Sequence, residues 1–470
     1  MRGFSQRLCA RLLMPRKAAA ADDEGMRSAR AQKRTRESVA VSIGGRHYRR
    51  RGYRRLDRPA YVKDIVTPFE RYSEKRTPLS RGYVPPAGWD EELLSKKLVP
   101  SIAKNGSLPR DEPGYSQIDL AQRVAGFHIA MAANAHTGGW TRPDLTESLG
   151  SFYDWQGQWG PANPFLPMDV EKLEFDDPAE ITEIVKDTAL FLGASLVGIT
   201  KVDRNWVFKP GWNRYGHTEI DLEGQMPEGQ LYAVVMAIET NREFVKHAPT
   251  AKASAAAGLG YSKMAFVAPS MAKFIGMLGY WSAAAGNDTA LSVPLAVDAG
   301  LGQLGRLGTL ITPEFGPRVR LCKVITDLPL VPTKPIDFGV TEFCEVCKKC
   351  ADYCPAHAIL PGHRTHKART ESTNVGLKKW PLNGERCIQF WYENGAKTAK
   401  GMFHLDCYQC INVCPFNKKP GIGHVLVRFS IRHLKFLNRA LVFGDKLFYK
   451  PLYTTGTAAG RPAPSNSTTS

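Results

Sequence analysis

Apolar and polar residues follow one another in patterns that predict both helices and strands in the middle of the chain. Residues 180–193 carry apolar side chains at i, i+3, i+4 and i+7 and end on Gly193, which predicts an amphipathic helix. Residues 195–200 and 231–238 are short runs made almost wholly of apolar residues. Such runs predict strands that are buried on both faces.

Two further stretches have helical spacing. Residues 117–132 predict one helix, and the Ala-, Gly- and Met-rich residues 251–286 predict two helices that meet at Pro269. Residues 291–329 alternate short apolar runs with Gly and Pro turns. The middle of the chain is therefore expected to mix helices and strands.

Composition changes along the chain and suggests its division into parts. The first residues are rich in Arg and Ala with little apolar periodicity, and the last are rich in Ser, Thr, Pro, Ala and Gly, so both ends are predicted to be disordered. The predicted parts are a disordered basic arm (1–58), an N-terminal wrapping region (59–173), a central core (174–335), a cysteine-rich domain (336–424), a basic, apolar segment packing on the core (425–453) and a disordered tail (454–470).

Charge limits the partners that need to be considered. The chain has a formal net charge of +18, but most of that excess lies within residues 1–58. The remainder is close to balanced, so nucleic-acid binding is not expected of the globular part. The basic, apolar residues 425–449 leave contact with a membrane surface open as an alternative to packing.

The chain shows no legible export signal. No window of about 18 apolar residues exists, and Arg50-Arg51 is followed by further charged residues, not by the apolar stretch of a twin-arginine signal. A cytoplasmic location is therefore expected, or the periplasmic face of the membrane if the start is misassigned.

Eight of the ten cysteines form two runs and one outlier. The first run is C-x2-C-x2-C-x3-C-P, and the second is C-x2-C-x3-C-P. In the first pattern three cysteines hold one [4Fe–4S] cluster and the fourth reaches a second cluster. The predicted ligand sets are Cys344, Cys347, Cys350 and Cys414 for cluster 1, and Cys354, Cys387, Cys407 and Cys410 for cluster 2.

Zinc and disulfide bonds are the alternatives for these cysteines. Zinc sites usually show two C-x2-C pairs without the third cysteine and without the terminal Cys-Pro. Disulfides would need an oxidising compartment, and cysteines packed this closely could not all pair without strain. Cys387 is proposed as the eighth ligand only by its position and by the need for one more thiolate.

A longer stretch before the clusters resembles a known family. The run from Pro294 to Leu330 contains the glycine-rich residues 300–305, then Arg306, then Leu321-Cys-Lys-Val324, and the two cysteine runs follow it. In this order the segments resemble the catalytic subunit of corrinoid-dependent reductive dehalogenases, over roughly residues 175–449.

The resemblance implies an α+β fold, with a nitroreductase-like corrinoid-binding core and a bacterial ferredoxin-like domain with two [4Fe–4S] clusters. It implies a base-off corrinoid (cobalamin) and a tyrosine that donates a proton. Tyr261, Asn287 and Arg306 look like the family's catalytic positions. Tyr280 and Trp281 are competing aromatics for the pocket, and Trp206 and Trp212 are weaker candidates.

The function implied is replacement of a carbon–halogen bond of an organohalide by carbon–hydrogen, with a halogenated aromatic as one candidate substrate. An external reductase or ferredoxin is expected to supply the electrons. Two alternatives remain: an epoxyqueuosine reductase-like corrinoid and iron–sulfur enzyme acting on tRNA, and a ferredoxin-type electron carrier. The carrier explains the cysteines but leaves most of the chain without a role.

Overall fold

A computed structural model describes most of the regions predicted to be folded. The described residues are 37–50, 53–66, 68–78, 80, 108–137, 171–213, 218–398, 401–418 and 422–449. The predicted tail, most of the predicted basic arm and much of the predicted wrapping region lie outside them.

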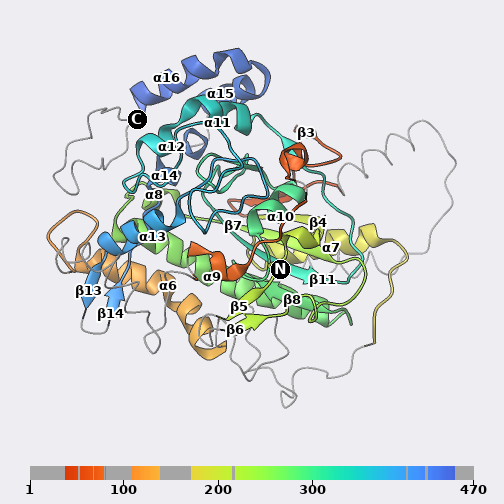
Figure 1. The fold of residues 1–470 in the computed structure, drawn as a ribbon. Helices are drawn as coiled ribbons and strands as arrows, with labels where there is room; N and C mark the ends of the chain where they lie inside the picture. Colours follow the sequence, from red (N-terminus) through yellow and green to blue (C-terminus); the bar gives the residue numbers. More distant parts are fainter. Residues whose placement is uncertain are drawn as a thin grey trace.

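An antiparallel sheet of six strands lies at the centre of the molecule (Figure 1). Across the sheet the order is β2 (Arg46–Arg49), β1 (Ala40–Ile43), β4 (Leu196–Lys201), β7 (Tyr232–Glu239), β11 (Val319–Thr326) and β8 (Ser282–Ala285). Strands β4 and β7 confirm the two predicted buried strands. Each is almost wholly buried because both faces of the sheet are covered.

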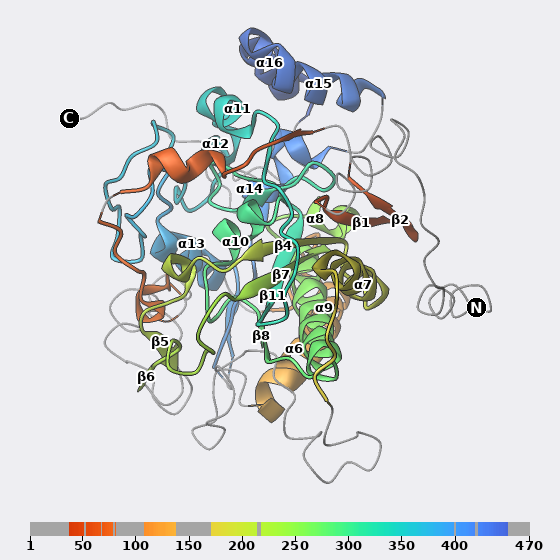
Figure 2. The same cartoon turned by 90° about the vertical axis from the view of Figure 1, so that its right-hand side faces the viewer.

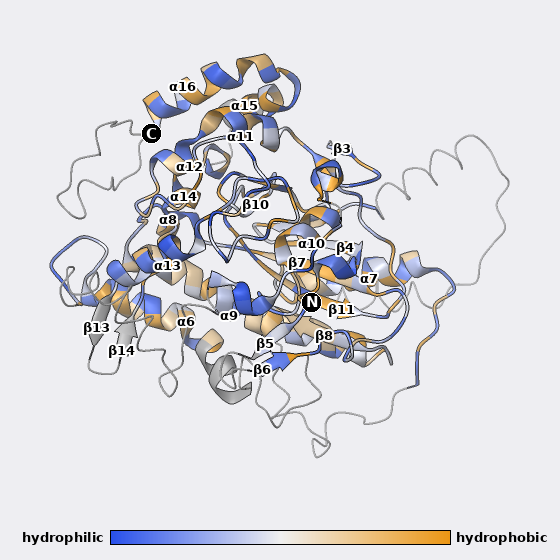
Figure 3. Cartoon of the chain, in the orientation of Figure 1, coloured by the Kyte–Doolittle hydropathy of each residue, from blue (hydrophilic) through white to orange (hydrophobic). Residues whose placement is uncertain are grey.

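The side chains of β7 alternate between two hydrophobic cores, as the pleat of a strand requires. Ala233, Val235 and Ala237 face one core, and Val234, Met236 and Ile238 face the other. Helices α7 (Pro178–Phe191) and α9 (Ala251–Gly276) contribute to the second core, and α10 (Ser292–Asp298) contributes to the first (Figure 2). The hydropathy colouring of the central strands follows this burial (Figure 3).

Helix α7 confirms the predicted amphipathic helix. Its N-cap is Asp177, whose carboxylate accepts a hydrogen bond from Ala179 N, and Pro178 occupies the first turn, where it loses no hydrogen bond. Beyond its end, Gly193 adopts a φ of 110°, a conformation that glycine tolerates and that turns the chain into β4.

The prediction of two helices over residues 251–286 is wrong. Helix α9 runs without a break through Pro269, and residues 282–285 form the edge strand β8. The proline ring at residue 269 removes one backbone hydrogen bond of the helix. Packing of α9 against its neighbours compensates for that loss. Helix α6 (Gln117–Thr137) crosses α9 so closely that a Cβ at Gly258 would lie 2.3 Å from the Phe127 ring.

The boundary predicted for the basic arm is also wrong. Residues 40–43 form β1, which pairs with β2 and with the central strand β4. Val39 and Val41 are buried in the core of the sheet. These few apolar residues stand among arginines, so the composition of the segment hid them.

The cluster domain consists of short helices joined by loops. They are α11 (Val340–Cys347), α12 (Lys349–Asp352), α13 (Gly384–Glu393) and α14 (Gln409–Asn412). Short two-stranded ladders lie around the core and this domain: β3 (Arg54–Arg55) with β12 (Ile336–Asp337), β5 (Gly211–Asn213) with β6 (Thr218–Ile220), β9 (Gln303–Leu304) with β10 (Leu310–Ile311), and β13 (Ala396–Thr398) with β14 (Gly401–Phe403).

The C-terminal segment packs on the cluster domain, not on the catalytic core as predicted. Helices α15 (Ile422–His433) and α16 (Asn438–Phe448) lie over α11 and α12 in both views (Figures 1 and 2). Ile431 and Val442 point into the core that contains the cluster cysteines. Among the described residues, none of the helices combines the length and apolar character needed to span a membrane.

Candidate active site and cluster ligands

The four cysteines predicted to hold cluster 1 lie together in the structure. All four line one small hollow, together with Leu307 and Phe416. Burial and the neighbouring thiols of Cys344 and Cys347 raise the pKa of Cys414, and burial together with Cys344 and Cys414 raises the pKa of Cys350. These protons must leave when iron binds, because the thiolate is the ligand.

The cysteines of predicted cluster 2 form a second group, which includes Cys387. Burial, then the thiols of Cys410 and Cys354, raises the pKa of Cys387. The pKa of Cys407 is raised by burial and then by Cys410, Cys387 and Cys354. Helix α13 therefore brings Cys387 near the remaining cysteines, and the division of the eight thiols between two cubane clusters stays a prediction.

A cavity of about 490 Å³ lies between the sheet and the cluster domain. Its walls come from four parts of the chain: Tyr61 and Tyr72 from the N-terminal segment, Trp206 and Phe208 from the segment after β4, Asn287, Leu291 and Val297 from the β8–α10 region, and Trp380, Leu382, Cys387 and Trp391 from the cluster domain. Cys387, a predicted ligand of cluster 2, forms part of the wall. None of the described residues that line the cavity is a histidine.

Tyr261 and Asn287 meet at the edge of this cavity. Tyr261 lies on α9, and its phenol oxygen accepts a hydrogen bond from Asn287 Nδ2 at 3.1 Å. Arg320 Nη1, from β11, donates a second hydrogen bond to the same oxygen at 3.0 Å. The phenol oxygen therefore accepts from an amide and from a cation, which leaves its own proton free for another acceptor.

Arg320 is held between two aromatic rings. Its guanidinium lies 4.3 Å from the centre of the Tyr261 ring and 5.2 Å from that of Tyr408. Asp406 lies 4.0 Å away. Burial opposes the charge on Arg320, but these neighbours outweigh it and raise its pKa above the ordinary value. Since Tyr408 follows the ligand Cys407 directly, the same arginine links the tyrosine to the loop that holds cluster 2.

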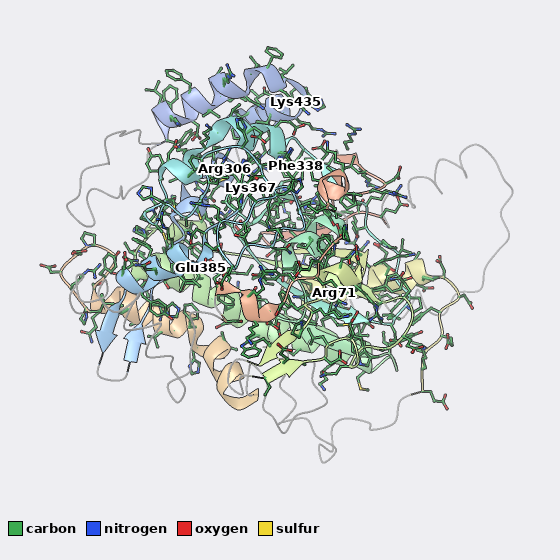
Figure 4. The ribbon with its side chains drawn as sticks, in the orientation of Figure 1. Arg71, Arg306, Phe338, Lys367, Glu385 and Lys435 are labelled. Atoms are coloured by element: carbon green, nitrogen blue, oxygen red, sulfur yellow. The ribbon has the colours of Figure 1, made fainter. Side chains whose placement is uncertain are left out.

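The structure does not bring Arg306 to Tyr261. Its guanidinium is buried in the cluster domain (Figure 4) and lies 4.6 Å from the centre of the Trp380 ring. All four of its hydrogen bonds end at backbone oxygens, those of Cys344, Leu360, Gly362 and Glu345. The basic partner expected for the tyrosine is thus Arg320, and Arg306 ties the catalytic core to the cluster loops.

One signal in the sequence pointed to Arg320. Strand β11 is otherwise almost wholly apolar, yet it contains Arg320 and Lys323, and charged residues are rarely buried without a partner. The family resemblance instead favours Arg306. Only the register of β11 shows which arginine faces α9.

Lys323 holds the loop that carries Asn287. Its ammonium donates four hydrogen bonds, of 2.7 to 3.1 Å, to the backbone oxygens of Gly286, Asp288 and Ala290 and to Ser292 Oγ. Burial lowers the pKa of Lys323 to about 8. Thr289, in the same loop, has a φ of 65°, which is unusual for a β-branched residue and is maintained by its surroundings.

The aromatic candidates separate clearly. Trp206 lines the cavity and donates to Asp298 Oδ2 at 3.1 Å. Tyr280 is buried, and its hydroxyl donates to Leu173 O, so it takes no part in the site. Trp281 packs against the hydrophobic core, and Trp212 stacks under Lys75 outside the cavity lining.

Comparison with known proteins supports the cluster assignment. Residues 343–418 match the model of the 4Fe-4S dicluster domain family. The two clusters predicted from the cysteine spacing are confirmed at the level of the domain, and the zinc and disulfide alternatives are excluded. The match covers only this part of the chain, so it leaves the larger core to be explained separately.

The core is included in matches to the sequences of known enzymes. The chain is 36% identical to the tetrachloroethene reductive dehalogenase of Sulfurospirillum multivorans over 436 residues, 82% of this chain and 80% of that protein. It is 37% identical over 301 residues to the enzyme of the same name from Desulfitobacterium hafniense strain Y51, 55% of this chain and 52% of that one. An epoxyqueuosine reductase from Lactococcus garvieae matches at 28% identity over only 33% of the chain and 40% of that protein.

A solved structure shares the fold. It is a catabolic reductive dehalogenase, NpRdhA, in complex with 3-bromo-4-hydroxybenzoic acid, with a TM-score of 0.57 and 20% identity. The match covers 87% of this chain and 50% of that protein, so this chain spans about half of its length. The α+β fold with its two-cluster domain is thereby confirmed. Together with the 36% identity over most of both sequences, it shows that the chain belongs to the reductive dehalogenase family.

Proposed function

We propose that this chain replaces the carbon–halogen bond of an organohalide by a carbon–hydrogen bond, with Tyr261 as the proton donor. The reaction consumes one organohalide, two electrons and one proton, and it yields the reduced product and one halide ion. The observation that supports this most directly is the phenol oxygen of Tyr261, which accepts hydrogen bonds from Asn287 and Arg320 beside a large cavity.

The cavity suits a corrinoid. It is large, its walls are mainly aromatic and aliphatic, and Cys387, a predicted cluster ligand, lies in one wall. Tyr61, Trp206, Asn287, Leu291 and Trp391 are among the residues that would hold the corrinoid. When bound, the corrinoid would supply the reduced cobalt that takes part in cleaving the carbon–halogen bond, and the clusters would supply its electrons one at a time.

The protein's own contribution is to deliver a proton at one fixed place. A phenol is a poor acid at neutral pH, so its conjugate base must be stabilised as the proton leaves. Arg320 supplies a positive charge 3.0 Å from the phenol oxygen, and Asn287 supplies a neutral donor at 3.1 Å. Both hydrogen bonds strengthen as the oxygen becomes negative, which favours the transition state over the ground state.

The test is halide release by protein loaded with corrinoid and iron, with reduced viologen as electron source. Tyr261→Phe removes the proton and keeps the ring, so we expect turnover to fall by about 10²–10⁴-fold. Tyr280→Phe is the matched control, because Tyr280 is a buried tyrosine outside the site, and it should leave turnover unchanged. Normal turnover of Tyr261→Phe with full cofactor content would rule out this tyrosine as the donor.

The substrate, the electron donor and the location are further parts of the proposal. Relatives act on tetrachloroethene by name, and the structural neighbour holds a brominated hydroxybenzoate, so a panel should include chlorinated ethenes and halogenated phenols. A separate ferredoxin or reductase is proposed as the donor, and the cytoplasm as the location. Cell fractionation tests the location, and reduction of the clusters by purified ferredoxin tests the donor.

A further inference from the structure

Asp406 is a buried acid that lies between the two elements carrying Tyr261 and Arg320. It directly precedes Cys407, and only 2% of its surface is exposed. One carboxylate oxygen, Oδ1, lies 4.0 Å from Nη2 of Arg320 on β11. The other, Oδ2, accepts a hydrogen bond from Ser254 Oγ on α9 at 2.8 Å. The acid therefore joins the helix that carries the tyrosine to the strand that carries the arginine.

Ser254 fixes the direction of this carboxylate. It lies seven residues before Tyr261, which is about two turns earlier on the same face of α9. Its hydroxyl donates to Asp406, and it accepts from Asp406 N at 3.2 Å and from Arg123 Nε, on α6, at 3.1 Å. A serine hydroxyl has one proton and two lone pairs, so its capacity for hydrogen bonds is fully used. The carboxylate thus has one defined place relative to the tyrosine.

Arg123 ties the loop of the acid to α6. Its Nη2 donates to His404 O at 2.7 Å, two residues before Asp406. Its guanidinium lies 4.8 Å from the centre of the Phe127 ring. That ring stacks on the ring of Tyr261, with 6.1 Å between the two centres. Helix α6 therefore supports both the loop of the acid and the ring of the tyrosine.

The other contacts of Arg320 leave its orientation less well defined. Its Nη1 donates to the phenol of Tyr261, and the rings of Tyr261 and Tyr408 flank its guanidinium. Ring faces attract a cation without setting the direction of each N–H group. Its Nε is buried and has no acceptor among the described residues. Among those residues, Asp406 is the one acid that forms an ion pair with Arg320.

We propose that Asp406 is a positioning residue, which through Arg320 holds a positive charge at the place where the Tyr261 oxygen becomes negative. The inference rests on the proposed role of Tyr261 as proton donor. Asp406 is not among the residues that line the cavity, so it acts on the reaction only through the arginine. Its carboxylate exchanges no proton in the reaction and forms no bond to the substrate.

Asp406→Asn, assayed by halide release, tests this role. The amide keeps the shape of the side chain and one oxygen for Ser254, but it removes the charge. We expect kcat to fall by about ten- to hundredfold, as for a catalytic group displaced by roughly 1 Å, and KM to stay the same. In Arg320→Met protein the same substitution should change kcat by less than about twofold, because no guanidinium is left to hold.

The matched control takes an acid from another buried arginine of the same strand. Glu239 pairs with Arg318, two residues from Arg320, at 2.9 Å. Glu239→Gln should therefore leave kcat unchanged. Iron and corrinoid contents are measured on every sample, so that all rates refer to fully loaded protein.

A second variant covers the case in which Asp406→Asn fails to fold or loses iron beside Cys407. Ser254→Ala frees the carboxylate without altering the cluster loop. It removes one hydrogen bond to a charged group, so we expect kcat to fall by about three- to tenfold. This loss, too, should appear only where Arg320 is present.

Three results would overturn the inference. Equal losses with and without Arg320 would assign Asp406 to the stability of the fold. An unchanged kcat in both variants would show that the arginine needs no acid to hold it. A higher kcat would mean that the acid only weakens the positive charge beside the phenol. Each leaves the proposed function intact while the wild-type protein releases halide and Tyr261→Phe does not. No halide release by the wild type would refute both.

Discussion

A buried arginine and a partly buried one show how differently the two halves of this molecule use a positive charge. Arg306, in the cluster domain, donates only to backbone oxygens and stacks on Trp380. Arg320, in the catalytic core, stacks on two tyrosines and donates to the phenol oxygen of Tyr261. Backbone oxygens do not change charge, but a phenol can. Arg306 therefore fixes the loops around cluster 1, and Arg320 can respond to chemistry.

The surroundings of the two arginines support this distinction. Arg306 is fully buried, and the loops it joins lie at the cluster 1 cysteines, far along the chain from Tyr261. Arg320 contacts both Tyr261 and Tyr408, so it lies between the proposed proton donor and the residue that follows Cys407, a predicted ligand of cluster 2. Burial alone does not identify a catalytic cation. What distinguishes a catalytic cation from a structural one is the chemical nature of the groups that accept its hydrogen bonds.

The largest effect that tests this comparison is on turnover. Arg320→Met should lower kcat by about 10²–10³-fold, because one preorganised donor to a developing negative charge is lost. Iron and corrinoid contents should stay normal. Halide release and metal analysis on the same sample check both statements. Arg320→Lys, which keeps a charge but not the planar stack, should recover part of the rate. A normal kcat in Arg320→Met would show that Arg320 is no more catalytic than Arg306.

The reciprocal substitution should act on stability. Arg306→Met leaves several buried backbone oxygens without a donor, and we expect a loss of roughly 3–5 kcal/mol in the free energy of unfolding. Thermal unfolding and the iron content per chain measure this, with iron expected to be lost first from cluster 1. Molecules that keep a full set of clusters should turn over normally. A stable, fully loaded Arg306→Met protein that is inactive would contradict the structural role.

The two halves also differ in how far the sequence predicts them. The predicted cluster ligands follow a local code, since the spacing of seven cysteines within two runs predicts how they are shared, and only Cys387 stands outside that spacing. The contact proposed to be catalytic joins Tyr261 on α9 to Arg320 on β11, 59 residues apart. Which arginine makes this contact depends on strand register and on the path of α9. Neither follows from local spacing, and the helix itself runs through Pro269 against its local preference.

The comparison of buried charges extends to a buried acid, Asp298. Its expected effect, on the pH dependence of stability, is smaller than the effects of the two arginines. Asp298 accepts hydrogen bonds from Tyr61 and Trp206, and it pairs with no cation among the described residues. Burial raises the pKa of Asp298 to about 7, above its ordinary value near 3.8. Between pH 4 and pH 7 the folded protein then binds one proton more than the unfolded chain. The free energy of unfolding therefore falls as the pH rises through this window.

Replacing the acid should remove that slope. From pH 5 to pH 8 the wild-type protein should lose about 2–3 kcal/mol through Asp298, which corresponds to a few degrees in Tm, and Asp298→Asn should not show this loss. Asp111→Asn alters an exposed acid and should follow the wild type. Thermal unfolding of the three proteins at both pH values provides the measurement. Parallel shifts in all three would mean that the carboxyl is charged at pH 5, and that hydrogen bonds from Tyr61 and Trp206 alone suffice to hold a buried negative charge beside the cavity.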